Sequence, residues 1–151
     1  MKDKDKSYLT AITRKKLSAP MRWLYNNRSL GPNIIRRLDY GCGQGSDVVL
    51  NPLAFERYDP HFFPTKPKGK FDLITCIYVL NVLQPNAMED TIERVFNLLA
   101  PGGTAYFAVR RDVSPQGFTK RGTFQCEVLL PFRKIVENKS FCIYYLVKPI
   151  K

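Results

Sequence analysis

The 151-residue sequence predicts an α/β fold: a sandwich around a mostly parallel central sheet. Two nearly continuous apolar runs, 71–78 and 104–109, are typical of strands that are buried on both faces. Between them, the apolar residues of 86–99 recur with the helical period. In addition, a glycine-rich turn at 41–45 follows one expected strand and precedes an expected helix. Strands that alternate with helices in this way favour a parallel sheet.

The remaining elements follow from local signals. Ser18 is a good N-cap and Pro20 suits a first helical turn, so a helix is expected over 18–27. Apolar runs and turn residues then predict strands at 34–40, 55–58, 123–129 and 141–147 and helices at 46–51 and 131–138.

Composition indicates one folded domain. With 44% hydrophobic residues the chain can bury a core, so we expect a single domain over 18–151 after a basic N-terminal arm over 1–17. No apolar run approaches the roughly 18 residues of a membrane span. The N-terminal residues have no apolar segment of the kind that a secretory signal carries, so a cytoplasmic location is expected.

The net charge of +11 is unevenly distributed. Residues 1–37 hold 10 basic and 2 acidic side chains, whereas residues 38–100 hold 5 and 8. The basic segments 1–37 and 110–121 are either a binding surface for nucleic acid or simply a solvated surface; charge by itself does not choose between them. The oligomeric state is not predicted.

Metal chemistry is not expected. The four cysteines have no CxxC spacing and His61 is the only histidine, so the sequence predicts reduced, packed thiols and no metal site.

The sharpest motif is Leu38-Asp-Tyr-Gly-Cys-Gly-Gln-Gly45. A glycine loop between a strand and a helix lets backbone approach a ligand closely. Asp59 comes 20 residues after Asp39, at the end of the next expected strand, where a carboxylate can accept hydrogen bonds from ribose hydroxyls. The pair predicts a nucleoside ligand. The G-x-G-x-G spacing differs from the G-x-G-x-x-G of dinucleotide-binding enzymes, which disfavours an oxidoreductase.

This loop resembles motif I of the class I S-adenosylmethionine-dependent methyltransferases. The run 71–78 followed by Val79-Leu-Asn-Val-Leu83 resembles the family's motif IV, and Pro101-Gly-Gly103 resembles its passage into the fifth strand. The segments 58–64, 77–83 and 109–112 more narrowly resemble methyltransferases associated with DNA phosphorothioation systems. The resemblance implies a Rossmann-like methyltransferase sandwich. It also implies S-adenosyl-L-methionine as the cofactor, held by Asp39, Tyr40, Gly41, Cys42, Gly43, Gly45, Asp59, Pro60, Ile77 and Tyr78.

One departure from the family concerns the third strand. Only residues 60–70, with three prolines, lie between Asp59 and the run at 71–78, too few for the usual helix and strand. The sheet is therefore expected to lack that unit. Either the side chains of 60–63 cover the adenine ring in its place, or Phe62 and Phe63 only cap the core.

The methyl acceptor is not identified by these motifs. Tyr78, Asn81 and Arg110 are the catalytic candidates, because they follow strands on the ligand side of the sheet. Residues 14–18 are a candidate cover for the cofactor carboxylate. The expected function is methyl transfer from S-adenosylmethionine to a small molecule or a nucleic acid; the alternative is a catalytically silent partner subunit that binds the cofactor or nucleic acid.

Overall fold

The computed structural model describes residues 7–32, 35–113, 116–118 and 123–151. Its centre is a sheet of six strands in the order β2-β1-β3-β4-β8-β7, with a separate hairpin of β5 and β6. The strands are β1 (Arg37–Tyr40), β2 (Glu56–Tyr58), β3 (Phe71–Ile77), β4 (Leu99–Arg110), β5 (Gln116–Phe118), β6 (Phe124–Cys126), β7 (Arg133–Glu137) and β8 (Phe141–Val147). β1 to β4 are parallel to one another, and β8 is antiparallel to β4 and β7. The predicted Rossmann-like fold is confirmed.

Two helices cover opposite faces of this sheet. Helix α3 (Pro85–Leu98) buries Val95 in one apolar cluster, and α1 (Ala19–Asn26) buries Met21 and Leu24 in the other. Alternate strand residues separate the clusters: Ile74 belongs to the first and Leu73 to the second. The remaining helical elements are short: η1 (Ser7–Thr10), α2 (Ser46–Val49) and η2 (Leu80–Val82). No helix among the described residues is long and apolar enough to span a membrane.

The missing third strand is confirmed. Residues 60–70 form no helix or strand, and their one sheet-like feature is an isolated bridge between Asp59 and Phe63. β2 is consequently the edge strand of the described sheet.

The predicted boundaries of helices and strands agree closely with the structure where the hydrophobic periodicity of the sequence is strong. The Ser18 hydroxyl accepts a hydrogen bond from Met21 N and caps α1 as predicted. The last strand has the predicted bounds, and α3 differs by one residue at each end. β4 begins directly after α3, so Pro101-Gly-Gly103 lies within a strand, at an irregularity in the pairing with β3. Gly103 is required there, because a Cβ would lie 2.9 Å from Ala100 O.

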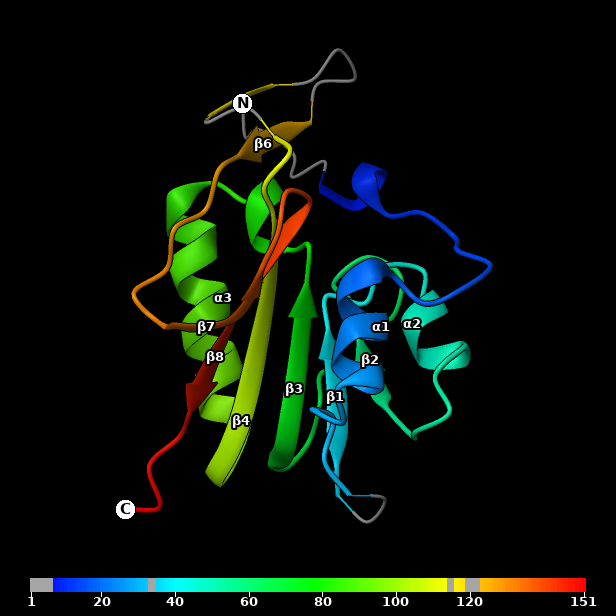
Figure 1. The fold of residues 1–151 in the computed structure, drawn as a ribbon, viewed down its shortest axis with the longest axis vertical. Coiled ribbons are helices and arrows are strands. Elements are labelled where there is room, and N and C mark those ends of the chain that lie inside the picture. Colours follow the sequence, from blue (N-terminus) through cyan, green and yellow to red (C-terminus); the bar gives the residue numbers. More distant parts are fainter. Residues whose placement is uncertain (1–6, 33–34, 114–115, 119–122) are drawn as a thin grey trace.

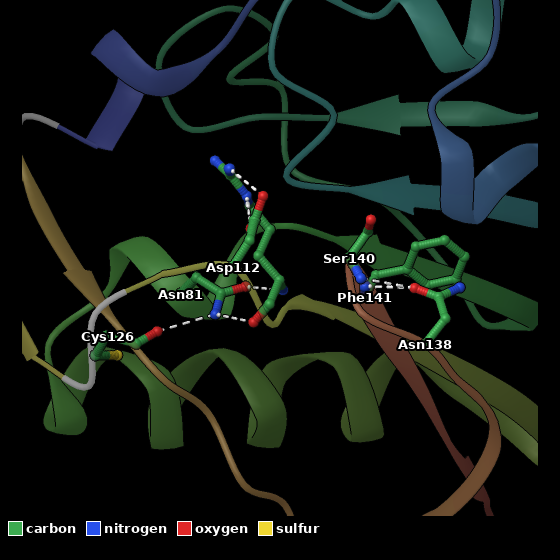
Figure 2. Close-up of polar contacts among 7 residues, drawn as sticks. Asn81, Asp112, Cys126, Asn138, Ser140 and Phe141 are labelled. Atoms are coloured by element: carbon green, nitrogen blue, oxygen red, sulfur yellow. Dashed lines mark hydrogen bonds and ion pairs between the residues drawn. The ribbon is translucent and has the colours of Figure 1, made fainter.

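The helix predicted over 131–138 is wrong. Arg133–Glu137 is the strand β7, which forms an antiparallel hairpin with β8. The Asn138 side chain makes the turn, because its Oδ1 accepts hydrogen bonds from Ser140 N and Phe141 N at 2.8 and 2.9 Å (Figure 2). The β-branched pair Ile135 and Val136, followed by an asparagine turn, was the local signal for this hairpin.

Candidate functional site

The parallel strands β1, β2 and β3 end at one edge of the sheet, beneath the N-terminal segment (Figure 1). A cavity of about 850 Å³ lies at this edge. Its walls include nine of the ten residues predicted to hold a cofactor: Asp39, Tyr40, Gly41, Cys42, Gly43, Asp59, Pro60, Ile77 and Tyr78. The tenth, Gly45, lies behind the wall, where it precedes α2 and packs beside Phe63. The structure therefore brings the sequence-predicted residues together.

The glycine loop needs its glycines for their backbone conformation. Gly41, Gly43 and Gly45 all have positive φ, between 57° and 86°. This region is costly for residues with a Cβ. Gly41 N and Cys42 N both donate to Tyr58 O, at 2.7 and 3.0 Å, which anchors the loop on β2.

Asp59 makes three hydrogen bonds with backbone N–H groups. Its Oδ2 accepts from Gly43 N at 2.8 Å, and its Oδ1 accepts from His61 N at 2.9 Å and Phe62 N at 3.1 Å. An ionised carboxylate has about four acceptor sites, so it retains capacity for a further donor from the cavity. Asp59 therefore fastens the glycine loop to the turn after β2 while facing the ligand space.

The floor of the site is acidic. Asp39 is 3% exposed and accepts a hydrogen bond from Thr75 Oγ1 at 2.9 Å. Burial, and then the nearby charges of Asp47 and Asp59, raise its pKa to about 8, against the opposing effect of the Thr75 hydrogen bond. Asp47 is also buried, and accepts from Ser18 N and Ser18 Oγ at 2.7 and 2.6 Å. The neighbouring carboxylates hinder the ionisation of Asp39 because they repel further negative charge. The site therefore favours a cationic ligand and disfavours a diphosphate.

The catalytic candidates Tyr78, Asn81 and Arg110 all line the cavity. Tyr78 is half-buried and has a φ of 61°, an unusual conformation for a residue with a bulky side chain. Its pKa is raised by burial, against the lowering effect of Arg14 and Arg110. Backbone strain at the end of a strand is typical of positions whose side chain must point at a ligand.

Asn81 is bound to the backbone on both sides. Its Nδ2 donates to Cys126 O at 2.9 Å and Arg110 O at 3.3 Å, and its Oδ1 accepts from Arg110 N at 2.6 Å (Figure 2). The residue is 1% exposed. This amide therefore ties η2 to the end of β4 and to β6.

The basic loop after β4 is only partly described. Arg110 donates twice to Asp112, at 2.9 and 3.0 Å, and Arg111 Nη1 donates to Asn138 O at 2.7 Å. Lys120 and Arg121, at the end of the basic segment 110–121, lie outside the described residues. So do residues 1–6 of the predicted arm.

The comparisons with known proteins agree with this geometry. Residues 11–124 match the profile of a methyltransferase domain, well over half of the chain. The chain belongs to this methyltransferase domain family. No curated protein matches it significantly.

Solved methyltransferases share the fold at low identity. One is the 1,6-didemethyltoxoflavin N1-methyltransferase of Burkholderia thailandensis, solved with 1,6-didemethyltoxoflavin and S-adenosylhomocysteine. It is 13% identical to this chain. The match covers 97% of this chain and 80% of that protein, with a TM-score of 0.61. DhpI, in complex with S-adenosylhomocysteine, is 18% identical over 87% of this chain and 83% of its own, with a TM-score of 0.58. A third match is an S-adenosylmethionine-bound amino pentose methyltransferase from Micromonospora echinaspora, with 22% identity and a TM-score of 0.42. The match covers 58% of this chain, and this chain spans about half of the length of that protein.

Sequence reasoning missed two walls of this methyltransferase cavity. The first is the N-terminal segment, from which Tyr8, Ala11 and Arg14 contribute. Of these, only Arg14 was a candidate, and the polar composition of 1–17 gave no signal for a packed segment. The second wall is α3, which contributes Asp90 and Arg94.

The sequence predicts reduced, packed thiols. All four cysteines are described and are free thiols. Burial raises the pKa of Cys42, the one in the glycine loop, to about 12, so its thiol is protonated at neutral pH. No group of three potential metal ligands occurs among the described residues.

Proposed function

We propose that this protein transfers a methyl group from S-adenosylmethionine to a small-molecule acceptor. The acidic environment of the glycine loop is the observation that carries the proposal. S-adenosylmethionine has a sulfonium and an ammonium group against one carboxylate, so it is a net cation, whereas a dinucleotide carries a diphosphate. Buried Asp39, with Asp47 and Asp59 nearby, fits the first ligand and opposes the second.

The residues around the cavity fit the parts of this cofactor. Gly41 and Gly43 leave room for backbone to approach the ligand, and the unused acceptor capacity of Asp59 suits a ribose hydroxyl pair. Arg14 is a cationic residue in the cavity wall, and its backbone N donates to Ser46 Oγ directly after the glycine loop. It suits the carboxylate of the cofactor. When bound, S-adenosylmethionine supplies an activated methyl group. The chain's own task is then to hold an acceptor in line with it and to exclude water.

The acceptor side of the cavity favours a small molecule. The whole cavity, cofactor space included, has a volume of about 850 Å³, which lies within the range of roughly 300–1,000 Å³ typical of small-molecule sites. Tyr78 and Arg110 line it and suit acceptor positioning, whereas Asn81 suits the support of that wall. The Burkholderia neighbour, which has the same fold, was solved with 1,6-didemethyltoxoflavin and S-adenosylhomocysteine bound. The narrower resemblance to phosphorothioation-associated methyltransferases stays a prediction.

Nucleic acid is the second candidate acceptor, on the ground of the basic segments 1–37 and 110–121. Binding through phosphate contacts weakens with salt along a log–log line, with a slope of roughly 0.7–0.9 per contact. If this protein binds DNA or RNA with such a slope and methylates it, nucleic acid would replace the small molecule as the proposed acceptor.

Calorimetry tests the cofactor directly. Titration with S-adenosylmethionine, S-adenosylhomocysteine and NAD should give binding of the first two and none of NAD. Binding of NAD alone would overturn the proposal. Transfer of a labelled methyl group into metabolite and nucleic-acid fractions then identifies the acceptor class. Cofactor binding without transfer into either fraction would instead support the silent partner subunit.

A further inference from the structure

The N-terminal segment lines the cavity and is fastened to the glycine loop and α2. We call residues 7–14 the strap. Arg14 N donates to Ser46 Oγ at 2.9 Å, Thr13 Oγ1 donates to Gln44 Oε1, and Gln44 Nε2 donates to Ala11 O at 3.4 Å. Figure 1 shows this segment, in blue, at the end of the sheet to which β3 points. The strap is therefore a wall of the ligand site, fixed at residues 11–14.

The other end of the strap lies against an aromatic side chain. The ring of Tyr8 stacks on that of His61, with centroids 4.0 Å apart and planes 10° from parallel. The Phe62 ring packs edge-on against the His61 ring, with centroids 4.7 Å apart. Tyr8 and His61 are both exposed and both line the cavity. Two flat rings thus face each other within the ligand space.

His61 is held beside the predicted ribose ligand. It follows Asp59 by two residues in a tight turn, where Asp59 N and Phe63 N donate to each other's carbonyl oxygens at 3.0 Å. The Asp59 carboxylate closes this turn by accepting from His61 N. The turn directly follows the edge strand β2, so it presents His61 beside the carboxylate that is proposed to bind the ribose.

We propose that Tyr8 and His61 form a clamp that binds the adenine ring of the cofactor between them. This inference rests on the proposed function, because it requires an adenosine-containing ligand. In the structure each ring is the stacking partner of the other; a base inserted between them gives both rings a new face to stack on. Only Leu9 and Thr10 separate Tyr8 from the fixed part of the strap, so the clamp opens by moving one turn of helix.

Truncated ligands locate the interaction. S-adenosylhomocysteine and 5′-methylthioadenosine share the adenosine but differ in the amino-acid end. Replacing Tyr8 with Ala should weaken both by the same factor, about 5- to 100-fold, which is the usual effect of losing one stacking platform. Tyr8→Phe should keep the wild-type affinity, because its ring remains. His61→Ala should weaken both ligands as Tyr8→Ala does.

Tyr25→Ala is the matched control. Tyr25 is 38% exposed against 37% for Tyr8, and it lies on α1 outside the cavity. This variant should bind both ligands as the wild type does. Unchanged binding in Tyr8→Ala, or tighter binding, would overturn the clamp; the latter would mean that Tyr8 competes with the base. Failure of the wild type to bind either ligand would overturn the proposed function and the clamp with it.

Discussion

The carboxylate of Asp59 accepts a hydrogen bond from Gly43 N at 2.8 Å and so joins the carboxyl ends of two neighbouring strands. The same side chain closes the turn that presents His61. The carboxylate proposed to bind the ribose therefore also sets the shape of the loop beside it. A change at this position acts on the ligand and on the loop together.

Replacing Asp59 with Asn separates the two effects in part. An amide keeps one acceptor oxygen for the turn, but it loses the charge and presents a donor towards either Gly43 N or the turn. Cofactor affinity should fall at least about tenfold by calorimetry, because charge-assisted hydrogen bonds contribute about 1.5–3 kcal/mol. Asp72→Asn is the control: its carboxylate also accepts from a backbone N–H, that of Arg36, but lies outside the cavity. If Asp59→Asn and Asp72→Asn bind the cofactor with equal affinity, Asp59 acts only in the turn and does not contact the ligand.

Gly43 is expected to tolerate no side chain, for a reason that involves the strap. A Cβ there would lie 3.0 Å from the Cβ of Ala11, on a backbone with a φ of 57°. Gly43→Ala should therefore push the strap away and lower cofactor affinity about tenfold. Ala11→Gly added to this variant should restore part of the affinity, leaving the strain of positive φ, about 1 kcal/mol.

The control for that experiment is Gly117→Ala. A Cβ at Gly117 meets nothing within 4 Å, so affinity should be unchanged. If Ala11→Gly restores no affinity, the contact that matters at Gly43 is with the ligand and not with the strap.

Asp39 should make stability depend on pH. Its pKa of about 8 in the folded protein lies above the usual value near 4, so folding favours the protonated carboxyl. Its contribution to stability is therefore fully present below about pH 4 and is lost as the pH rises through 8. Relative to Asp39→Asn, the wild type should lose about 4 kcal/mol of unfolding free energy between pH 5 and pH 9 in denaturant titrations. Parallel pH profiles for the two proteins would contradict this.

A bound cation should have the opposite effect on the same group. It favours the ionised form of Asp39, so cofactor binding near pH 7 should release protons. Calorimetry in buffers with different ionisation enthalpies measures this release. The release should be smaller in Asp39→Asn; an equal release would place the titrating group elsewhere.

Asn81 should matter mainly for stability. Its three hydrogen bonds join the buried carbonyl of Cys126 and part-buried backbone groups of Arg110, and Ala would leave them without this partner. Asn81→Ala should lower the unfolding free energy by about 2–3 kcal/mol. Asn97→Ala, at an exposed position on α3, should change it by less than about 0.5 kcal/mol. Lost methyl transfer with unchanged stability would show instead that Asn81 contacts the acceptor.

The elements with the strongest local signals were predictable. The helical period of α3, the N-cap at Ser18 and the apolar run of β3 are properties of neighbouring residues, and the structure has all three. The spacing from Asp39 to Asp59 also sufficed to place both acids at one sheet edge. Residues 131–138 were mispredicted because a short amphipathic segment suits either a helix or an edge strand, and the choice depends on the hairpin with β8.

The sequence by itself determined the fold class, the glycine loop and the absence of a third strand, because each depends on residue spacing along the chain. Only the tertiary structure decided which residues complete the cavity. Tyr8 stacks on His61, 53 positions away, and Asn81 binds the backbone of Cys126, 45 positions away. Such contacts leave no periodic pattern in the sequence, because they arise where loops and strand ends meet after the chain has folded.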